Sequence, residues 1–209
     1  MIMYSAERLE SRGLKYMKKK YGDEVKFTIR YSGPDLGTYD MYLTVEGHEN
    51  WDVRLTWYKD DNSYRDNYMS WVLREEVERI YQPFIEQVYG DCKAYNTPYG
   101  GQVSNLYTKN TTVEEYLETA NNSGFYVFVT TDQSNNEEDL KALVELLKEN
   151  NLKIDIDVYY VTEVLVKGIT RDNFKETVVR DKQYFCRGGY MTRKSKEDYY
   201  YKWKEGELR

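Results

Sequence analysis

Apolar and polar residues alternate most clearly between residues 124 and 166. A run of aromatic and β-branched residues at 125–129 predicts a strand. Acidic residues at 137–139, followed by apolar residues at helical spacing, predict a helix that ends near Asn150. Alternation at 154–160 predicts a second strand with one side on helices and the other side in water. This stretch is therefore a strand–helix–strand unit.

The first half of the chain contains the same two periodicities in another order. They predict a helix at 5–21, strands at 25–31, 41–45 and 51–57, a long helix at 67–89 and a short strand at 92–97. Turn-forming residues at 32–35 and 60–63 predict loops between these elements. Pro83 lies inside the long helix, where its missing N–H should bend or divide the helix.

Residues 98–102 are the best candidate for a boundary between modules, because Pro and Gly favour turns and linkers. Beyond this boundary helices and strands alternate, and Thr112 with Glu115 three residues later has the pattern of a capping box. Together the elements predict an α+β fold with a mainly antiparallel sheet and helices packed on one face. We expect two modules of similar size, 1–97 and 98–209, with one continuous domain as the alternative.

Length and charge restrict the class of protein. A chain of 209 residues suits one large domain or two small ones, and its formal charge of -6 argues against a nucleic-acid partner. No apolar run approaches the roughly 18 residues needed to span a membrane. Residues 1–10 lack the apolar core of a signal peptide, which predicts a cytoplasmic protein. An extracytoplasmic protein is the alternative, if an export segment has been removed.

Tyrosine is unusually abundant, with 23 Tyr against 6 Phe. Because Tyr combines an apolar ring with a hydroxyl group, this excess implies many half-exposed tyrosines, either at the rim of a thin core or on a recognition surface. Tyr42, Tyr58 and Tyr159 lie out of phase with the apolar residues of their strands, which predicts a partner-binding surface on an open sheet face. The same alternation places Tyr31 with Phe27 on the opposite, apolar side of its strand.

Histidine and cysteine are too few for most sites that use them. His48 is the only histidine and lies in a predicted hairpin turn, where a solvated side chain is expected. Cys92 and Cys186 are expected to be two separate thiols, with a disulfide between them as the alternative. The sequence therefore predicts no catalytic residue, no cofactor and no bound metal.

Two groups of carboxylates are candidates for metal binding or for catalysis. Asp155 and Asp157 share the polar side of a predicted strand, where they either bind a divalent cation or face water. A second group contains Glu75, Glu76 and Glu78 on one helix, with Asp91 beyond it. Glycoside cleavage needs two opposed carboxylates, and neighbouring helix positions do not provide them. Both groups are therefore interpreted as solvated surface.

Three short motifs in the first half also indicate a family. They are Tyr21-Gly22, Asp66-Asn67-Tyr68-Met69 and Tyr89-Gly90-Asp91-Cys92, each at an end of a predicted helix. In these motifs and in the order of its elements, the stretch 5–97 resembles small α+β domains of exported or lipoprotein-type proteins of Gram-positive bacteria. The resemblance implies export but no catalytic residue. The chain departs from it in having no lipid-attachment cysteine near residue 1.

Taken together, these patterns predict a non-enzymatic binding or interaction protein, with the cell surface as one location. Its partner would be a protein, a peptide or a carbohydrate. The alternative is a carboxylate-based hydrolase acting on sugars. A deep cleft with two facing carboxylates would favour the hydrolase, and a shallow Tyr-rich surface would favour binding.

Overall fold

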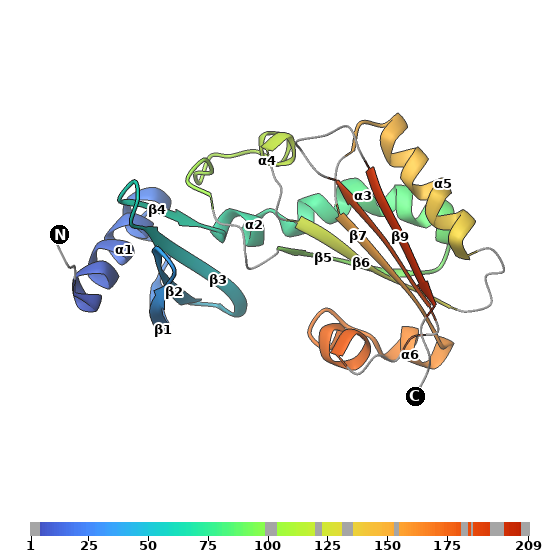
Figure 1. Ribbon diagram of the computed structural model, residues 1–209, viewed down its shortest axis with the longest axis horizontal. Helices are drawn as coiled ribbons and strands as arrows, with labels where there is room; N and C mark the ends of the chain where they lie inside the picture. The colour runs from blue at the N-terminus through green and yellow to red at the C-terminus, as the bar shows by residue number, and fades with distance from the viewer. Residues whose placement is uncertain are drawn as a thin grey trace. The chain divides into compact units, whose positions relative to one another are not determined.

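The chain forms two compact units in the computed structural model, which describes residues 5–98, 104–119, 123–130, 136–152, 155–180, 184, 186–192 and 199–205. Met1–Leu73 and Pro98–Asn122 form one unit, and Arg74–Thr97 and Ser123–Arg209 form the other (Figure 1). The predicted α+β class is confirmed. The prediction of two continuous modules divided at Pro98 is wrong, because the chain leaves the first unit after Leu73 and returns to it at Pro98.

The first unit is an antiparallel sheet with one long helix on it. It contains α1 (Ala6–Tyr21), β1 (Phe27–Asp35), β2 (Thr38–Val45), β3 (His48–Tyr58), β4 (Ser63–Asp66), α2 (Tyr68–Val72) and α4 (Val113–Thr119), with the strands in the order β1-β2-β3-β4. The sequence did not predict β4. It also placed a turn at 32–35, which is the end of β1, whereas the chain turns at Leu36 and Gly37.

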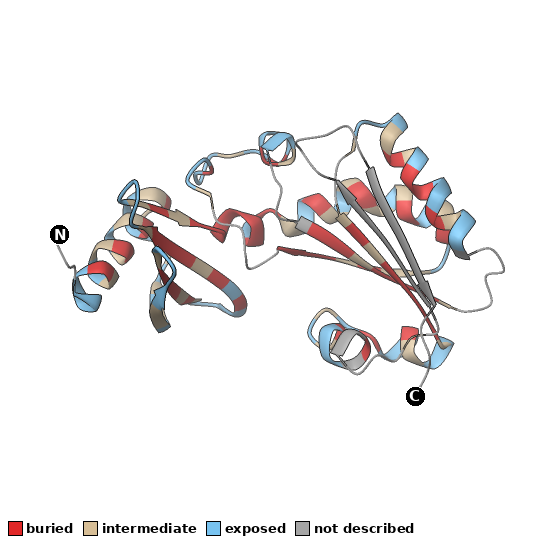
Figure 2. Ribbon diagram, in the orientation of Figure 1, coloured by how far each residue is buried: buried red, intermediate tan, exposed pale blue. Residues whose placement is uncertain are grey.

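Helix α1 begins as the sequence predicts, with the side chain of Ser5 accepting a hydrogen bond from the backbone N–H of Arg8. Its buried side lies on alternate residues of β2 and β3, coloured as buried in Figure 2. Gly13 permits this close packing, because a Cβ atom there would lie 2.9 Å from both Leu55 Cδ2 and Met41 Sδ. A larger residue at this position would force the fully buried side chains of Met41 and Leu55 to move.

A buried ion pair joins α1 to β4. Lys20 Nζ lies 2.7 Å from Asp66 Oδ2, and the two side chains are only 9% and 1% exposed. Tyr21 donates to Asp66 Oδ1 at 2.6 Å, and Tyr16 donates to Oδ2 at 3.2 Å. The backbone of Asp66 also exchanges two hydrogen bonds with Ser104, at 3.1 and 2.9 Å. Asp66 therefore connects the first helix, the last strand and the segment that returns from the second unit.

The tyrosines around Asp66 remain protonated. Burial is the main cause that raises the pKa of Tyr16 and Tyr21, and the charge of Asp66 and the hydrogen bonds to it raise both pKa values further. Both hydroxyls consequently act as hydrogen-bond donors to Asp66. With Lys20, they give this buried charge a complete set of partners.

We predict that Asp66→Asn lowers the free energy of unfolding by about 3–5 kcal/mol, because Lys20 then stays buried without a counter-charge. The measurement is urea denaturation followed by circular dichroism. Asp23→Asn is the matched control: Asp23 pairs with Lys18 on the surface, and its loss should change stability by about 1 kcal/mol or less. Lys20→Met added to Asp66→Asn should recover part of the loss. A loss for Asp66→Asn no larger than the control would contradict this account.

The second unit is a mixed sheet with helices. It contains α3 (Arg74–Tyr89), β5 (Lys93–Pro98), β6 (Ser123–Thr130), α5 (Asn136–Glu149), β7 (Asp155–Val161), α6 (Glu163–Gly168), the π-helix η1 (Lys175–Arg180), β8 (Cys186–Thr192) and β9 (Tyr199–Glu205). Strand order is β5-β6-β7-β8-β9; β6 and β7 are parallel, and β7-β8 and β8-β9 are antiparallel. The predicted strand–helix–strand unit is β6, α5 and β7.

Apolar side chains cover both faces of β6 and β7 in this second sheet. On one face the ring of Tyr81 from α3 contacts Phe125, with ring centroids 5.4 Å apart. On the other face lies a buried cluster of Phe128, Tyr159, Val161, Val166, Ile169, Phe174 and Val178. The prediction that helices pack on one face of the sheet therefore fits the first sheet but not the second.

The predicted long helix is divided at Leu73, not at Pro83. Pro83 lies exposed within α3, which continues to Tyr89. Helix α2 is held in the first unit, where Trp71 Nε1 and Asn67 Nδ2 both donate to the backbone oxygen of Asp52. The division thus coincides with the passage of the chain from one unit to the other.

Candidate functional site

The face of the first sheet opposite α1 is lined by tyrosine, arginine and aspartate. Strand register places Tyr31, Tyr42 and Arg54 side by side on β1, β2 and β3. Their neighbours along β2 point to the other side, where Met41 and Leu43 are fully buried under α1. Alternation therefore brings the polar and aromatic residues of three strands to one surface.

At the centre of this surface the three side chains form a ladder. The rings of Tyr31 and Tyr42 stack with centroids 4.3 Å apart and an interplanar angle of 17°. The guanidinium carbon of Arg54 lies 5.8 Å from the centroid of Tyr42. Because Tyr31 and Arg54 come from the strands on either side of β2, they cover opposite faces of the Tyr42 ring.

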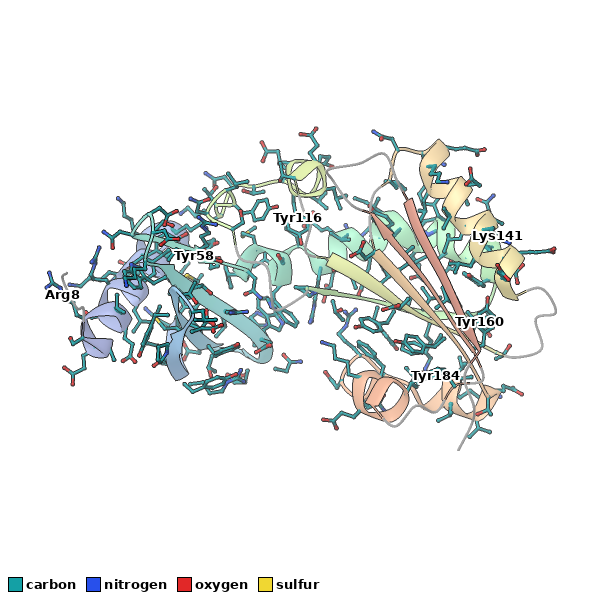
Figure 3. The ribbon with its side chains drawn as sticks, in the orientation of Figure 1. Arg8, Tyr58, Tyr116, Lys141, Tyr160 and Tyr184 are labelled. Atoms are coloured by element: carbon teal, nitrogen blue, oxygen red, sulfur yellow. The ribbon has the colours of Figure 1, made fainter. Side chains whose placement is uncertain are left out.

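Each of three arginines on this surface lies over a tyrosine ring and pairs with an aspartate. Arg54 Nη2 lies 2.5 Å from Asp40 Oδ2, and the other oxygen of Asp40 accepts from Thr56 Oγ1 at 2.7 Å. In the second set, Arg30 lies over Tyr31 and pairs with Asp52; in the third, Arg65 lies over Tyr58 and pairs with Asp61. We call these nine residues the Tyr–Arg face; Figure 3 labels Tyr58.

The central arginine is held in its charged form. Burial alone would lower the pKa of Arg54, but the hydrogen bond to Asp40 and the charge of Asp40 outweigh it and raise that pKa. Burial also raises the pKa of Tyr42. The centre of the face is therefore a fixed guanidinium beside a neutral phenol, in a geometry that three strands hold in place.

Two of the three predicted binding residues lie on this face. Tyr42 and Tyr58 are half-buried there, as their phase predicts. Tyr159 is wrongly assigned to an open surface, because its side chain is 1% exposed in the second unit, under α6 and η1.

The sequence pattern placed Tyr31 on the apolar side of its strand, which is wrong: Tyr31 is 54% exposed on the Tyr–Arg face. A bulge between Ile29 and Tyr31 reverses the alternation of β1 at that point. The residue before Tyr31 is an ordinary arginine, and nothing in its type indicates a bulge.

The other candidate residues do not converge on a reactive site. His48 is exposed and stacks on Trp51, with ring centroids 3.9 Å apart. Glu78 accepts two hydrogen bonds from Arg171, at 2.7 and 2.5 Å, and one from the backbone of Asn96. Within the described ranges, no group of three or more His, Cys, Asp or Glu side chains could hold a metal ion.

A shallow groove of about 350 Å³ lies between α3 and α5 in the second unit. Its lining residues are Gln87, Val88, Asp139, Ala142, Glu145, Leu146 and Glu149. All three carboxylates come from α5, while α3 contributes Gln87 and Val88. The groove therefore lacks the arrangement of carboxylates on facing walls that glycoside hydrolysis requires.

Cys92 carries a free thiol, and burial raises its pKa to about 12. The side chain of Cys186 lies outside the described residues. A nucleophilic cysteine needs a lowered pKa, so Cys92 is not suited to that role.

In a Cys186→Ser variant, we predict that Cys92 reacts with a disulfide reagent at pH 8 about a thousandfold more slowly than a small free thiol. The reason is that the thiolate fraction falls tenfold for each unit by which the pKa exceeds the pH. The rate should increase steadily up to about pH 12. A plateau near pH 9 would contradict the raised pKa, and the same reaction in denaturant gives the unperturbed control rate.

Comparisons of the chain with protein-family models, with curated proteins and with solved structures found no match. In the part of the chain that the structure describes, no helix is both long enough and apolar enough to cross a membrane.

Proposed function

We propose that the protein is a non-enzymatic binding protein whose Tyr–Arg face contacts a partner protein. The observation that supports this most is the repeated set of an arginine over a tyrosine ring, fixed by an aspartate. Tyrosine and arginine are enriched in the residues that dominate protein–protein binding energy. Because these side chains are already held by one another, little conformational freedom is lost when a partner binds.

A protein partner fits the face better than a carbohydrate. Sugars bind aromatic rings through an open ring face, whereas both faces of Tyr42 are covered, by Tyr31 and Arg54. Tyr58 has Arg65 over its ring, 4.1 Å from the centroid. The face offers aromatic rings, hydroxyl groups and guanidinium N–H donors together, which suit the mixed polar and apolar surface of a protein.

The hydrolase alternative has less support. Asp40 and Asp66, the buried carboxylates of the first unit, are each occupied by a cation and by hydroxyl donors. A general acid needs a free carboxyl group beside a substrate, and these two carboxylates are committed to holding strands and helices together. Export to the cell surface remains a prediction of the family resemblance.

The test uses a random-peptide phage library and a glycan array as probes of the full chain. Peptides selected on the full chain should bind the Tyr58→Ala variant at least about 30-fold more weakly, the loss typical of a residue that dominates an interface. Val164→Ala is the control, since Val164 is an exposed apolar residue of α6 in the other unit. Selected peptides that bind Tyr58→Ala unchanged would contradict the proposal. Sugar binding that Tyr58→Ala abolishes would replace the protein partner with a carbohydrate.

A further inference from the structure

Strand β1 forms one edge of the first sheet, and the two edges differ in how they are covered. At the other edge, β4 has four residues and is bridged at Asp66 by Ser104. Strand β1 has nine residues, all of them exposed or half-exposed. The outer side of an edge strand carries N–H and C=O groups that a further strand can pair with.

The bulge gives β1 an unusual internal symmetry. Four of its residues pair with the buried apolar residues of β2 and so face α1: Phe27 with Val45, Ile29 with Leu43, Ser32 with Met41 and Pro34 with Tyr39. These four positions are symmetric about the midpoint between Arg30 and Tyr31. Without the bulge the helix-facing residues would simply recur at every second position, with no fixed centre.

We propose that β1 pairs antiparallel with β1 of a second copy of this chain, about a two-fold axis between Arg30 and Tyr31. In this register Phe27 lies opposite Pro34 and Ile29 opposite Ser32, so every helix-facing residue meets a helix-facing residue of the other copy. The two four-stranded sheets then form one sheet of eight strands.

This register also brings residues of opposite charge together. Lys26, just before the strand, lies opposite Asp35 of the second copy, and both residues are exposed. The two-fold axis makes this contact twice in each dimer. Arg30 lies opposite Tyr31 of the other copy and repeats the arginine–tyrosine contact that already exists within one chain, where Arg30 lies 5.5 Å from the Tyr31 ring centroid. Opposite charges across a strand pair stabilise it.

The same features favour a second copy over an unrelated strand. A bulge in an edge strand disfavours the addition of a regular strand to that edge. A regular strand has one residue where β1 has two, and it would lose the match of faces beyond Arg30. Only a strand with the same bulge at the same place keeps the match on both sides, and a second copy supplies it.

The test is a charge exchange followed by sedimentation velocity over a range of concentrations. Lys26→Glu places two acids opposite each other, and Asp35→Lys places two bases opposite each other. Each single variant should form dimers about tenfold more weakly than the unchanged chain, because two like-charged contacts replace two favourable ones. An equimolar mixture of the two variants should regain the dimer, since the acid introduced in one variant then meets the base introduced in the other. The double variant should also regain it.

Lys15→Glu, an exposed position on α1, is the control for a change of net charge and should leave the dimer unchanged. Circular dichroism shows whether each variant is folded. A chain that remains monomeric up to its solubility limit would overturn the proposal. A dimer that both single variants preserve, or that the mixture fails to restore, would overturn this interface. These outcomes do not depend on the partner proposed for the Tyr–Arg face, because Lys26 and Asp35 are not among the nine residues of that face.

Discussion

The buried pair of Lys20 and Asp66 is the interaction on which the first unit depends. A carboxylate that is 1% exposed needs several partners, because removal of its hydration is costly. Its partners come from two places far apart in sequence: Lys20, Tyr16 and Tyr21 from α1, and the backbone N–H of Tyr68 beside β4. A buried pair contributes little net stability, but it allows few alternative arrangements of these elements.

The backbone of Asp66 also holds Ser104, in the segment that returns from the second unit. The chain passes out of the first unit where the helix is interrupted at Leu73, and it returns at Pro98. Because α1 covers one side of the four strands, the other side is left to polar and aromatic residues. The Tyr–Arg face thus follows from the same packing that buries Met41 and Leu55 beneath Gly13.

Local patterns predicted local structure well, and they failed where distant segments meet. Tyr42 and Tyr58 could be placed on an open face because each strand has a period of two. Tyr31 could not be placed in this way, because the bulge at Arg30 depends on how β1 pairs with β2. Tyr159 was misplaced because several residues of its buried cluster, such as Phe174, lie beyond the strand in sequence. No spacing indicates that Lys20 pairs with Asp66, or that Ser104 completes the edge beside it.

Asp66 fixes the returning segment to the first unit. Amide hydrogen exchange of Ser104 measures this attachment, because the Ser104 N–H donates to the backbone oxygen of Asp66 at 2.9 Å. We predict that the Ser104 amide exchanges only when the unit unfolds, with the same opening free energy as the amides of the buried strand residues Val53 and Leu55. Exchange of Ser104 at the rate of an open loop, while Val53 and Leu55 stay protected, would contradict it.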